Sequence, residues 1–210
     1  MNDKEGYKPV IEVYTTSSNI EDNRTAAYNT SWRPMHGGGT NFKTRKLVKK
    51  DSNRIEFKNT LFMTITPFLL MGPFIVWVFV FFLKDEVLIQ ILSLLPPLAF
   101  MGVGVFIYIR TNKNIVFDKT HGYYWKRKGS PNFNSMDDKN LVKLKEIVGI
   151  QLIQEFVSGD KNRYYSYEIN LVLKDNGRLN VIDHGDKHSI IRDSQQLADF
   201  LQKPLWKQRF

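Results

Sequence analysis

The 210-residue sequence contains no cysteine. Disulfide bonds and thiolate chemistry are therefore excluded, which suits a domain facing the cytosol. The opening residues, MNDKEGYKPV, lack a charged stretch followed by an apolar one, so we expect no cleavable signal peptide. The sequence also has no G-x-S-x-G, P-loop or G-x-G-x-x-G pattern and no paired-carboxylate signature. We therefore expect a protein that is not an enzyme and has no cofactor.

Two long segments lack charge altogether. Asn59 to Leu83 is 25 residues and Val87 to Ile109 is 23 residues, and neither contains Asp, Glu, Lys, Arg or His. At about 1.5 Å per residue, each is longer than the roughly 30 Å hydrocarbon core of a membrane. The pattern predicts two transmembrane helices joined by a tight turn at Lys84-Asp85-Glu86. Without ionisable residues in either span, an ion or proton pathway is not expected.

Prolines interrupt both apolar segments at matching depth. Pro73 lies ten residues before the end of the first and Pro97 ten residues after the start of the second. Ten residues correspond to about 15 Å, close to the bilayer midplane, where proline bends a helix. Two bent helices that pack together are favoured over a hinge or a substrate cavity.

Basic residues flank the apolar pair on one side. Seven Lys and Arg residues lie between positions 43 and 58, six between 110 and 128, and one, Lys84, in the connecting turn. The positive-inside rule therefore predicts both termini in the cytoplasm and two spans across a bacterial inner membrane.

Residues 43–58 also carry more than half of the excess charge of the chain. Their seven cations exceed two carboxylates by five, against a net charge of +9 for the whole protein. Such a segment beside a membrane attracts anionic headgroups. The alternative is that these charges only determine topology. Without zinc spacing, an RNP-like motif or a basic recognition helix, no nucleic-acid partner is expected. The predicted headgroup-binding residues are Lys43, Arg45, Lys46, Lys49 and Lys50.

The segment before the first span divides into two parts. Residues 1–42 are rich in Asn, Thr, Ser and Gly and are predicted to be a flexible cytoplasmic tail, although KPVIEVYTT favours a strand if it finds a sheet edge. The turn Asp51-Ser52-Asn53 between two short apolar pieces predicts a hairpin within residues 43–58.

Residues 113–206 have the pattern of a β-rich domain. Strands are predicted in NIVFD, YYWKRK, EIVGIQLIQEFV, YYSYEINLVL and RLNVID, with turns ending at Gly122 and Gly177. An amphipathic helix follows, with Asp193 as its predicted N-cap and Pro204 after its end. The predicted fold is an α+β membrane protein with a helical hairpin, an antiparallel sheet or barrel of at least five strands, and a C-terminal helix.

This order resembles the pleckstrin-homology-like barrel, in which a terminal helix closes one end of a bent sheet. IVFDKTHGYYWK and YSYEINLVLKDNGRLNVIDHG also resemble a group of proteobacterial two-span inner-membrane proteins. That resemblance covers most of the chain and implies no particular activity, because fold alone does not determine function.

Two histidine-containing segments are candidate sites. HGGG, residues 36–39, is similar to the oxyanion-hole segment of lipases, but without a nucleophile elbow a glycine-rich tail is the favoured interpretation. DHGDKH holds Asp183, His184, Asp186 and His188, which is a potential metal-binding cluster that lacks the H-E-x-x-H arrangement. A polar loop is the favoured interpretation there, and no metal site is assigned.

Aromatic residues suggest where a partner would bind. Six Tyr and Trp residues lie within 123–125 and 164–167, and strand alternation directs only about half of them inward. Tyr124 and Tyr164 are the predicted partner-binding residues, unless the aromatics face lipid headgroups instead.

Two functions are consistent with these features. The first is a non-enzymatic, membrane-anchored module whose cytosolic domain binds a protein or lipid partner. The alternative is an immunity or antitoxin-type membrane protein that neutralises a toxin. The sequence leaves homo-oligomerisation open.

Overall fold

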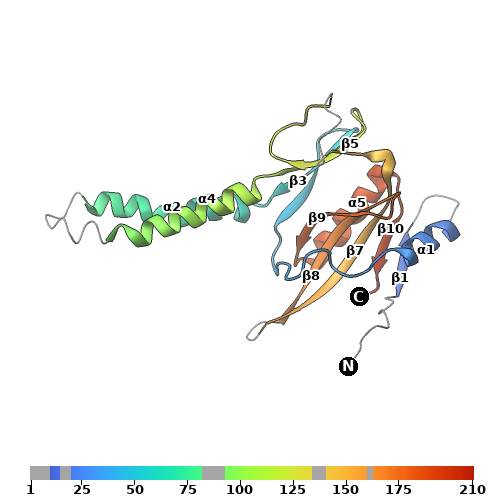
Figure 1. Ribbon diagram of the computed structural model, residues 1–210, viewed down its shortest axis with the longest axis horizontal. Coiled ribbons are helices and arrows are strands. Elements are labelled where there is room, and N and C mark those ends of the chain that lie inside the picture. Colours follow the sequence, from blue (N-terminus) through green and yellow to red (C-terminus); the bar gives the residue numbers. More distant parts are fainter. Residues whose placement is uncertain (1–9, 15–19, 82–92, 134–140, 160–162) are drawn as a thin grey trace.

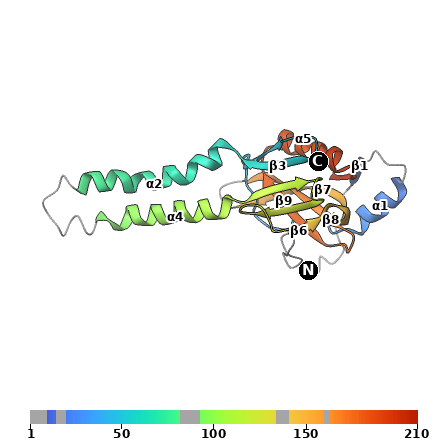
Figure 2. The same cartoon turned by 90° about the horizontal axis from the view of Figure 1, so that it is seen from above.

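The computed structural model describes residues 10–14, 20–81, 93–133, 141–159 and 163–210. Two five-stranded sheets form one end of the molecule, and two helices project from them side by side (Figures 1 and 2). The predicted mixture of α and β structure is confirmed. The predicted architecture of a two-span hairpin with a single sheet or barrel is wrong.

Sheet A has the strand order β1-β10-β7-β8-β9. The pairing of β10 with β7 is parallel and the other pairings are antiparallel. A β-bulge lies opposite Ile169 and Asn170, and Val181 on the bulged strand is in the core together with Leu179. The strands are β1 (Ile11–Tyr14), β7 (Ile147–Ser158), β8 (Arg163–Leu173), β9 (Arg178–His184) and β10 (Leu205–Gln208).

Sheet B is antiparallel throughout, with the order β2-β3-β4-β5-β6. The predicted hairpin around residues 51–53 is present as β2 and β3, and a second tight turn at Gly122 (φ 76°) joins β4 to β5. The strands are β2 (Arg45–Lys49), β3 (Arg54–Asn59), β4 (Asn114–Asp118), β5 (Tyr123–Arg127) and β6 (Leu141–Lys143), and a 3-10 turn, η1 (Leu144–Glu146), follows.

The main core lies between the two sheets and the helix α5 (Lys187–Leu201). Alternate residues of each strand point inward, among them Phe57 and Phe117 from sheet B and Ile169 and Leu171 from sheet A. Each of these side chains is almost fully buried, and burying one contributes about 1.5–3 kcal/mol to folding. Ile190 belongs to the face of α5 that completes this core.

The distribution of strands explains why no barrel forms. Strands β4 to β6 pair with the β2–β3 hairpin, which precedes the helices, whereas β7 to β9 pair with β10 and β1. Residues 113–206 are therefore divided between two open sheets. Both sheets are completed by segments outside that range, so the region is not an independent barrel.

The projecting helices are α2 (Leu61–Phe81) and α4 (Leu95–Thr111). Leu61–Phe79 is long and apolar enough to cross a membrane, and it is the only candidate span in the described parts of the chain. The 17 residues of α4 extend about 26 Å, less than the roughly 30 Å hydrocarbon core. The predicted second span begins among residues 82–92, which lie outside the described residues, as does the predicted turn at Lys84-Asp85-Glu86.

The structure places the two prolines of the predicted bends in α2 and α4. Pro73 lies inside α2, together with Pro67, which the sequence reading did not single out. Pro97 is in the first turn of α4. Because the segment before α4 lies outside the described residues, the matched bends stay a prediction.

The N-terminal segment is more structured than predicted. Residues 11–14 form β1 at the edge of β10, as the sequence allowed, and α1 (Ile20–Asn29) follows. Ala27 of α1 packs with Val172 and Trp206 on the outer face of sheet A. The segment after α1 also crosses this face, because the Gln151 side chain donates a hydrogen bond to Ser31 O (3.0 Å). The described part of residues 1–42 is thus part of the folded domain.

The C-terminal helix begins earlier than predicted. Asp186, not Asp193, is the N-cap of α5, and its carboxylate accepts a hydrogen bond from Ser189 N (2.8 Å). Asp193 lies in the middle of the helix and accepts from Leu47 N (3.3 Å), which ties α5 to β2. The helix ends at Leu201, before Pro204.

Candidate functional site

A cavity of about 330 Å³ with several charged residues lies where the sheets meet the helices, and we call it the basal cavity. Its walls come from the segment 36–40, from the start of β2, from the ends of β3 and β5, from the edge strand β9, and from the sheet-proximal ends of α2 and α4. Its lining residues are His36, Gly37, Gly38, Gly39, Thr40, Thr44, Arg45, Asn59, Met63, Arg110, Thr111, Lys126, Asn180, Val181, Ile182 and Asp183.

Lys126 is the cation held deepest in this cavity. It occupies an inward position of β5, on the same face as Tyr124, and its ammonium donates to Asn180 O (3.1 Å) and Asn180 Oδ1 (3.0 Å). Burial lowers the Lys126 pKa to about 8, against the opposing effect of Asp183. An ammonium has three donors, and these bonds use two of them.

Asp183 is the matching carboxylate, and Asn180 connects it to Lys126. Asn180 Nδ2 donates to Asp183 Oδ1 (2.8 Å). Burial raises the pKa of Asp183 to about 6, and the bond from Asn180 only partly offsets this effect. Glu168 lies directly opposite Asp183 on β8 and raises that pKa further by charge repulsion. Its two carboxylate oxygens accept from Met35 N (3.1 and 3.0 Å).

The glycine segment forms the outer wall of the basal cavity. Glu155 accepts from Gly38 N (2.9 Å) and Gly39 N (3.3 Å), and the Tyr164 hydroxyl donates to Gly39 O (2.7 Å). A side chain at Gly39 would overlap Ser166 Cβ, which lies 2.7 Å from the position a Cβ would take. Glu155 thus accepts from two of the amides that an oxyanion hole would use, and together with Tyr164 it holds this segment against sheet A.

Arg45 joins the other side of the cavity to the helices. Its guanidinium donates to Thr111 O (2.8 Å), Lys113 O (2.9 Å) and Phe57 O (3.3 Å). Burial lowers the Arg45 pKa to about 10. The predicted headgroup ligand Arg45 therefore has an internal role, fixing the end of α4 to sheet B.

The other predicted headgroup ligands do not form one surface. Lys43 Nζ donates to Ser189 Oγ (2.8 Å) at the start of α5. Lys46 is exposed and lies opposite Lys58 near the helices. Lys49 and Lys50 are exposed at the turn end of the β2–β3 hairpin, and interaction with Lys58 lowers the Lys50 pKa.

The two predicted partner-binding tyrosines are not exposed anchors. Tyr124 is buried in the main core with 3% of its surface exposed, and burial raises its pKa. That prediction is wrong, because Tyr124 pairs with Phe117 on the inward face of β4 and β5. Tyr164 is half-buried against the glycine segment. The exposed tyrosine is its neighbour Tyr165, whose ring contacts that of Phe156 (centroids 5.2 Å apart).

The residues of DHGDKH point to different places. Asp183 faces the basal cavity, Asp186 caps α5 and His188 is exposed. His184 is fully buried and its Nδ1 accepts from Asp186 N (3.2 Å), which places its proton on Nε2. Burial lowers the pKa of His184 to about 4. Within the described residues, no three His, Asp or Glu side chains are grouped closely enough to hold a metal ion.

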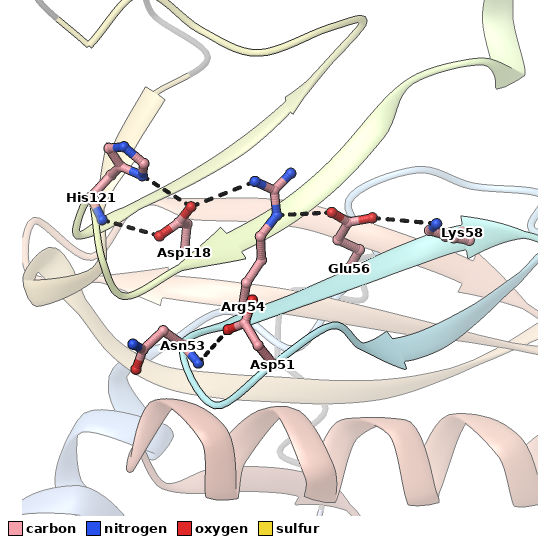
Figure 3. A network of polar contacts seen from close by, with 7 residues as sticks. All are labelled: Asp51, Asn53, Arg54, Glu56, Lys58, Asp118 and His121. Carbon is pink, nitrogen blue, oxygen red and sulfur yellow. Dashed lines mark hydrogen bonds and ion pairs between the residues drawn. The ribbon is translucent and has the colours of Figure 1, made fainter.

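A second polar cluster lies on the outer face of sheet B (Figure 3). Arg54 contacts Glu56 (2.9 Å) and Asp118 (3.7 Å), and Asp118 also accepts from the backbone and ring of His121 (both 3.0 Å). Burial by itself would raise the Asp118 pKa, but the bonds from His121 prevail and lower it. The Arg54 guanidinium lies 5.5 Å from the centre of the Trp125 ring. Each carboxylate of this network is paired with a cation, and Arg54 lies over the ring of the buried Trp125.

Sequence reasoning missed Lys126, Asn180 and Glu168. Strand alternation places Lys126 on the same face of β5 as Tyr124, a face that the sequence led us to expect at the surface, so only the register of β5 with β4 shows that Lys126 points inward. Glu168 and Asn180 face outward from sheet A, and only the covering segment 31–42 makes them buried or partly buried. Comparisons of the chain with models of known protein families and with curated proteins give no match.

Proposed function

We propose that this protein is a non-enzymatic binding module that α2 anchors in a membrane, with its two-sheet domain presented to a partner at the membrane surface. The observation that carries this proposal is the basal cavity, a pocket with charged residues at the foot of an apolar helix. Partners in this position are lipids or membrane proteins, because Met63 of α2 and Arg110 and Thr111 of α4 line the cavity. These residues lie at the ends of the helices that join the two-sheet domain (Figure 1).

The exposed surface of α2 supports the anchor. Its large apolar side chains are open to the surroundings, including Leu61 (73% exposed), Ile75 (70%) and Phe79 (71%). A continuous apolar surface of this size is unfavourable in water and is stabilised in hydrocarbon. The helix contains no charged residue over its 21 positions.

Strand pairing shows where the chain leaves and re-enters the two-sheet domain. Strand β3 leads into α2, β4 follows α4, and these two strands are neighbours in sheet B. The chain therefore re-enters the two-sheet domain beside the point where it leaves it. We propose that both sheets lie on the same side of the membrane, and the flanking Lys and Arg residues favour the cytoplasmic side of a bacterial inner membrane.

The buried charges support binding over a purely structural role. Burying an ammonium and a carboxylate destabilises a fold unless both are paired, and apolar residues in their place often give equal or greater stability. Lys126 and Asp183 do not contact each other directly but through Asn180. The ammonium and the carboxylate thus remain available to a ligand on the open side of the cavity.

Two measurements test this proposal. First, membranes from cells producing the full chain are extracted with alkaline carbonate, and the protein should stay with the lipid; release into the supernatant would contradict the anchor. Second, a photo-crosslinking residue is placed at Thr40, on the cavity, and in a control chain at Gln195, on the exposed side of α5. A product at Thr40 that is absent at Gln195 supports a partner there, whereas identical products at both positions would contradict it.

A further inference from the structure

The charges that line the basal cavity are predominantly positive. Arg45, Arg110 and Lys126 contribute three cations, against the single carboxylate of Asp183. Burial raises the pKa of Asp183 to about 6, so this carboxyl is mostly ionised at neutral pH and offsets one of the three cations. An anionic group entering the cavity would therefore meet a net attractive field.

Two of the three cations keep donors for such a group. Arg45 directs its guanidinium to three backbone carbonyls, so it contributes charge more than hydrogen bonds. Lys126 has one ammonium donor beyond its two bonds to Asn180. Arg110 is exposed in the last turn of α4, with its guanidinium 5.1 Å from the centre of the Phe106 ring. A donor from β5 and a donor from α4 thus border one space.

The wall opposite these donors leaves room for a bulky anion. Gly37, Gly38 and Gly39 place no side chains in the cavity, and Glu155 and Tyr164 hold that stretch of backbone in position. Phosphate, with its several acceptor oxygens, suits a site that supplies arginine and lysine donors from two directions.

The position of the cavity, beside the ends of α2 and α4, indicates that the phosphate belongs to a lipid. Met63, in the first turn of α2, and Arg110, in the last turn of α4, both line it. If Leu61–Phe79 crosses the hydrocarbon core, these two residues lie at its boundary, where lipid phosphates are found. Met63 supplies an apolar contact for the part of a lipid next to the phosphate.

Building on the proposed function, we infer that the basal cavity binds the phosphate of an anionic lipid headgroup, with Lys126 and Arg110 as its charged donors. The site accepts one lipid from the leaflet next to the domain. The exposed lysines of the β2–β3 hairpin are outside this site.

The test uses the full chain in detergent micelles, titrated with phosphatidylglycerol or phosphatidylcholine and followed by native mass spectrometry. We expect one phosphatidylglycerol to bind saturably, and Arg110→Gln to weaken that binding about tenfold, as loss of a charge-assisted hydrogen bond does. Lys49→Gln is the matched control, because Lys49 is exposed at the turn end of the β2–β3 hairpin and does not line the cavity. Equal weakening by both variants, or equal binding of the two lipids, would overturn the inference.

Two further measurements test the role of Lys126 and distinguish a lipid phosphate from a free phosphate. Lys126→Met should weaken binding as much as Arg110→Gln. If thermal unfolding shows that the Lys126 variant is not folded, the comparison of Arg110→Gln with Lys49→Gln decides alone. Inorganic phosphate and glycerol phosphate should not displace the lipid at equal concentration, and displacement by either would overturn the assignment to a lipid. A protein that resists carbonate extraction yet binds no phosphatidylglycerol refutes only this site, whereas a protein released by carbonate refutes the proposed function itself.

Discussion

Gly104 of α4 packs directly against the backbone of Pro67 in α2. A Cβ on Gly104 would lie 2.7 Å from Pro67 O and 3.1 Å from Met71 Cγ, so the two helices approach as closely as they do only because position 104 has no side chain. Small residues at such a position are typical of helix pairs in membranes, where close packing replaces the hydrophobic effect. Pro67 lies inside α2, where a proline removes a backbone hydrogen bond of the helix. Gly104 is one of the few buried residues of α4.

Gly104→Leu is therefore expected to separate α2 from α4 and to destabilise the helix pair by about 1–3 kcal/mol, the usual effect of overpacking. Gly102→Leu is the matched control, since nothing lies within 4 Å of a Cβ at that position. The measurement uses Phe68→Cys and Tyr108→Cys, whose native rings are 6.1 Å apart, in a chain that has no other cysteine. A short bismaleimide should link the two cysteines less efficiently in the Gly104 variant only, and equal linking in both variants would contradict the packing argument.

The buried ammonium of Lys126 predicts stability that rises with pH in the alkaline range. An unfolded chain holds a lysine proton up to about pH 10.5, whereas Lys126 loses its proton near pH 8 in the folded protein. Between these values the unfolded state binds more protons, so the free energy of unfolding increases with pH. We expect a gain of about 2–3 kcal/mol between pH 8 and 10, measured by denaturant unfolding in detergent. Lys126→Met should remove this gain, and a pH-dependent rise of the same size in that variant would assign it to other groups.

In the acid range, two buried groups act in opposite directions. His184 has a folded pKa of about 4, below its unfolded value of 6.5, so its contribution to stability is lost as the pH falls through this interval. Asp183 has a folded pKa of about 6, above its unfolded value of 3.8, so it adds stability as the pH falls through an overlapping interval. The two effects partly cancel in the native protein.

Asp183→Asn should remove this compensation while keeping an acceptor for Asn180. We expect the variant to lose stability more steeply than the native protein between pH 6 and 4, in thermal unfolding scans at several pH values. Adding His184→Gln should flatten the curve again. A variant with the same acid profile as the native protein would show that Asp183 does not titrate as its burial implies.

The hydroxyl of Tyr164 predicts a local effect at the glycine segment. Tyr164→Phe removes the bond to Gly39 O and should loosen residues 36–40 by about 1 kcal/mol, because one hydrogen bond is lost. Faster amide hydrogen exchange at Gly38 and Gly39 is the readout. Tyr165→Phe, a change at the exposed neighbouring tyrosine, should leave exchange at these amides unchanged. Faster exchange in both variants would indicate a general effect on the β7–β8 hairpin.

The strands and turns were largely predictable from the sequence, because their signals are local. The β2–β3 hairpin, the Gly122 turn, the turn at 174–177 and the inward alternation of Tyr167, Ile169 and Leu171 follow from periodicity and turn chemistry. The division into two sheets was not predictable in this way. It depends on pairings between strands far apart along the chain, such as β3 with β4 across both helices and β10 with β7 in parallel.

The basal cavity shows the same limit for the candidate site. Its glycine wall and Asp183 were noticed in the sequence, but as unrelated motifs, and both were interpreted as solvent-exposed loops. What unites them is the segment 31–42, which follows the outer face of sheet A and buries polar side chains that strand alternation directs outward. The prediction that Tyr124 lies at the surface was wrong for a related reason. The inward face of β5 is the one on which Tyr124 lies opposite Phe117 of β4, and only the register of the two strands reveals this.

The pairing of β1 with β10 has a consequence for how the protein is made. Strand β1, near residue 11, precedes the apolar helices in the sequence, whereas its partner β10, near residue 205, follows them. On the ribosome β1 is therefore synthesised long before the strand with which it pairs. Closing so long a loop is entropically unfavourable and such contacts form slowly. The edge of sheet A that β1 occupies is thus completed only after β10 has been made.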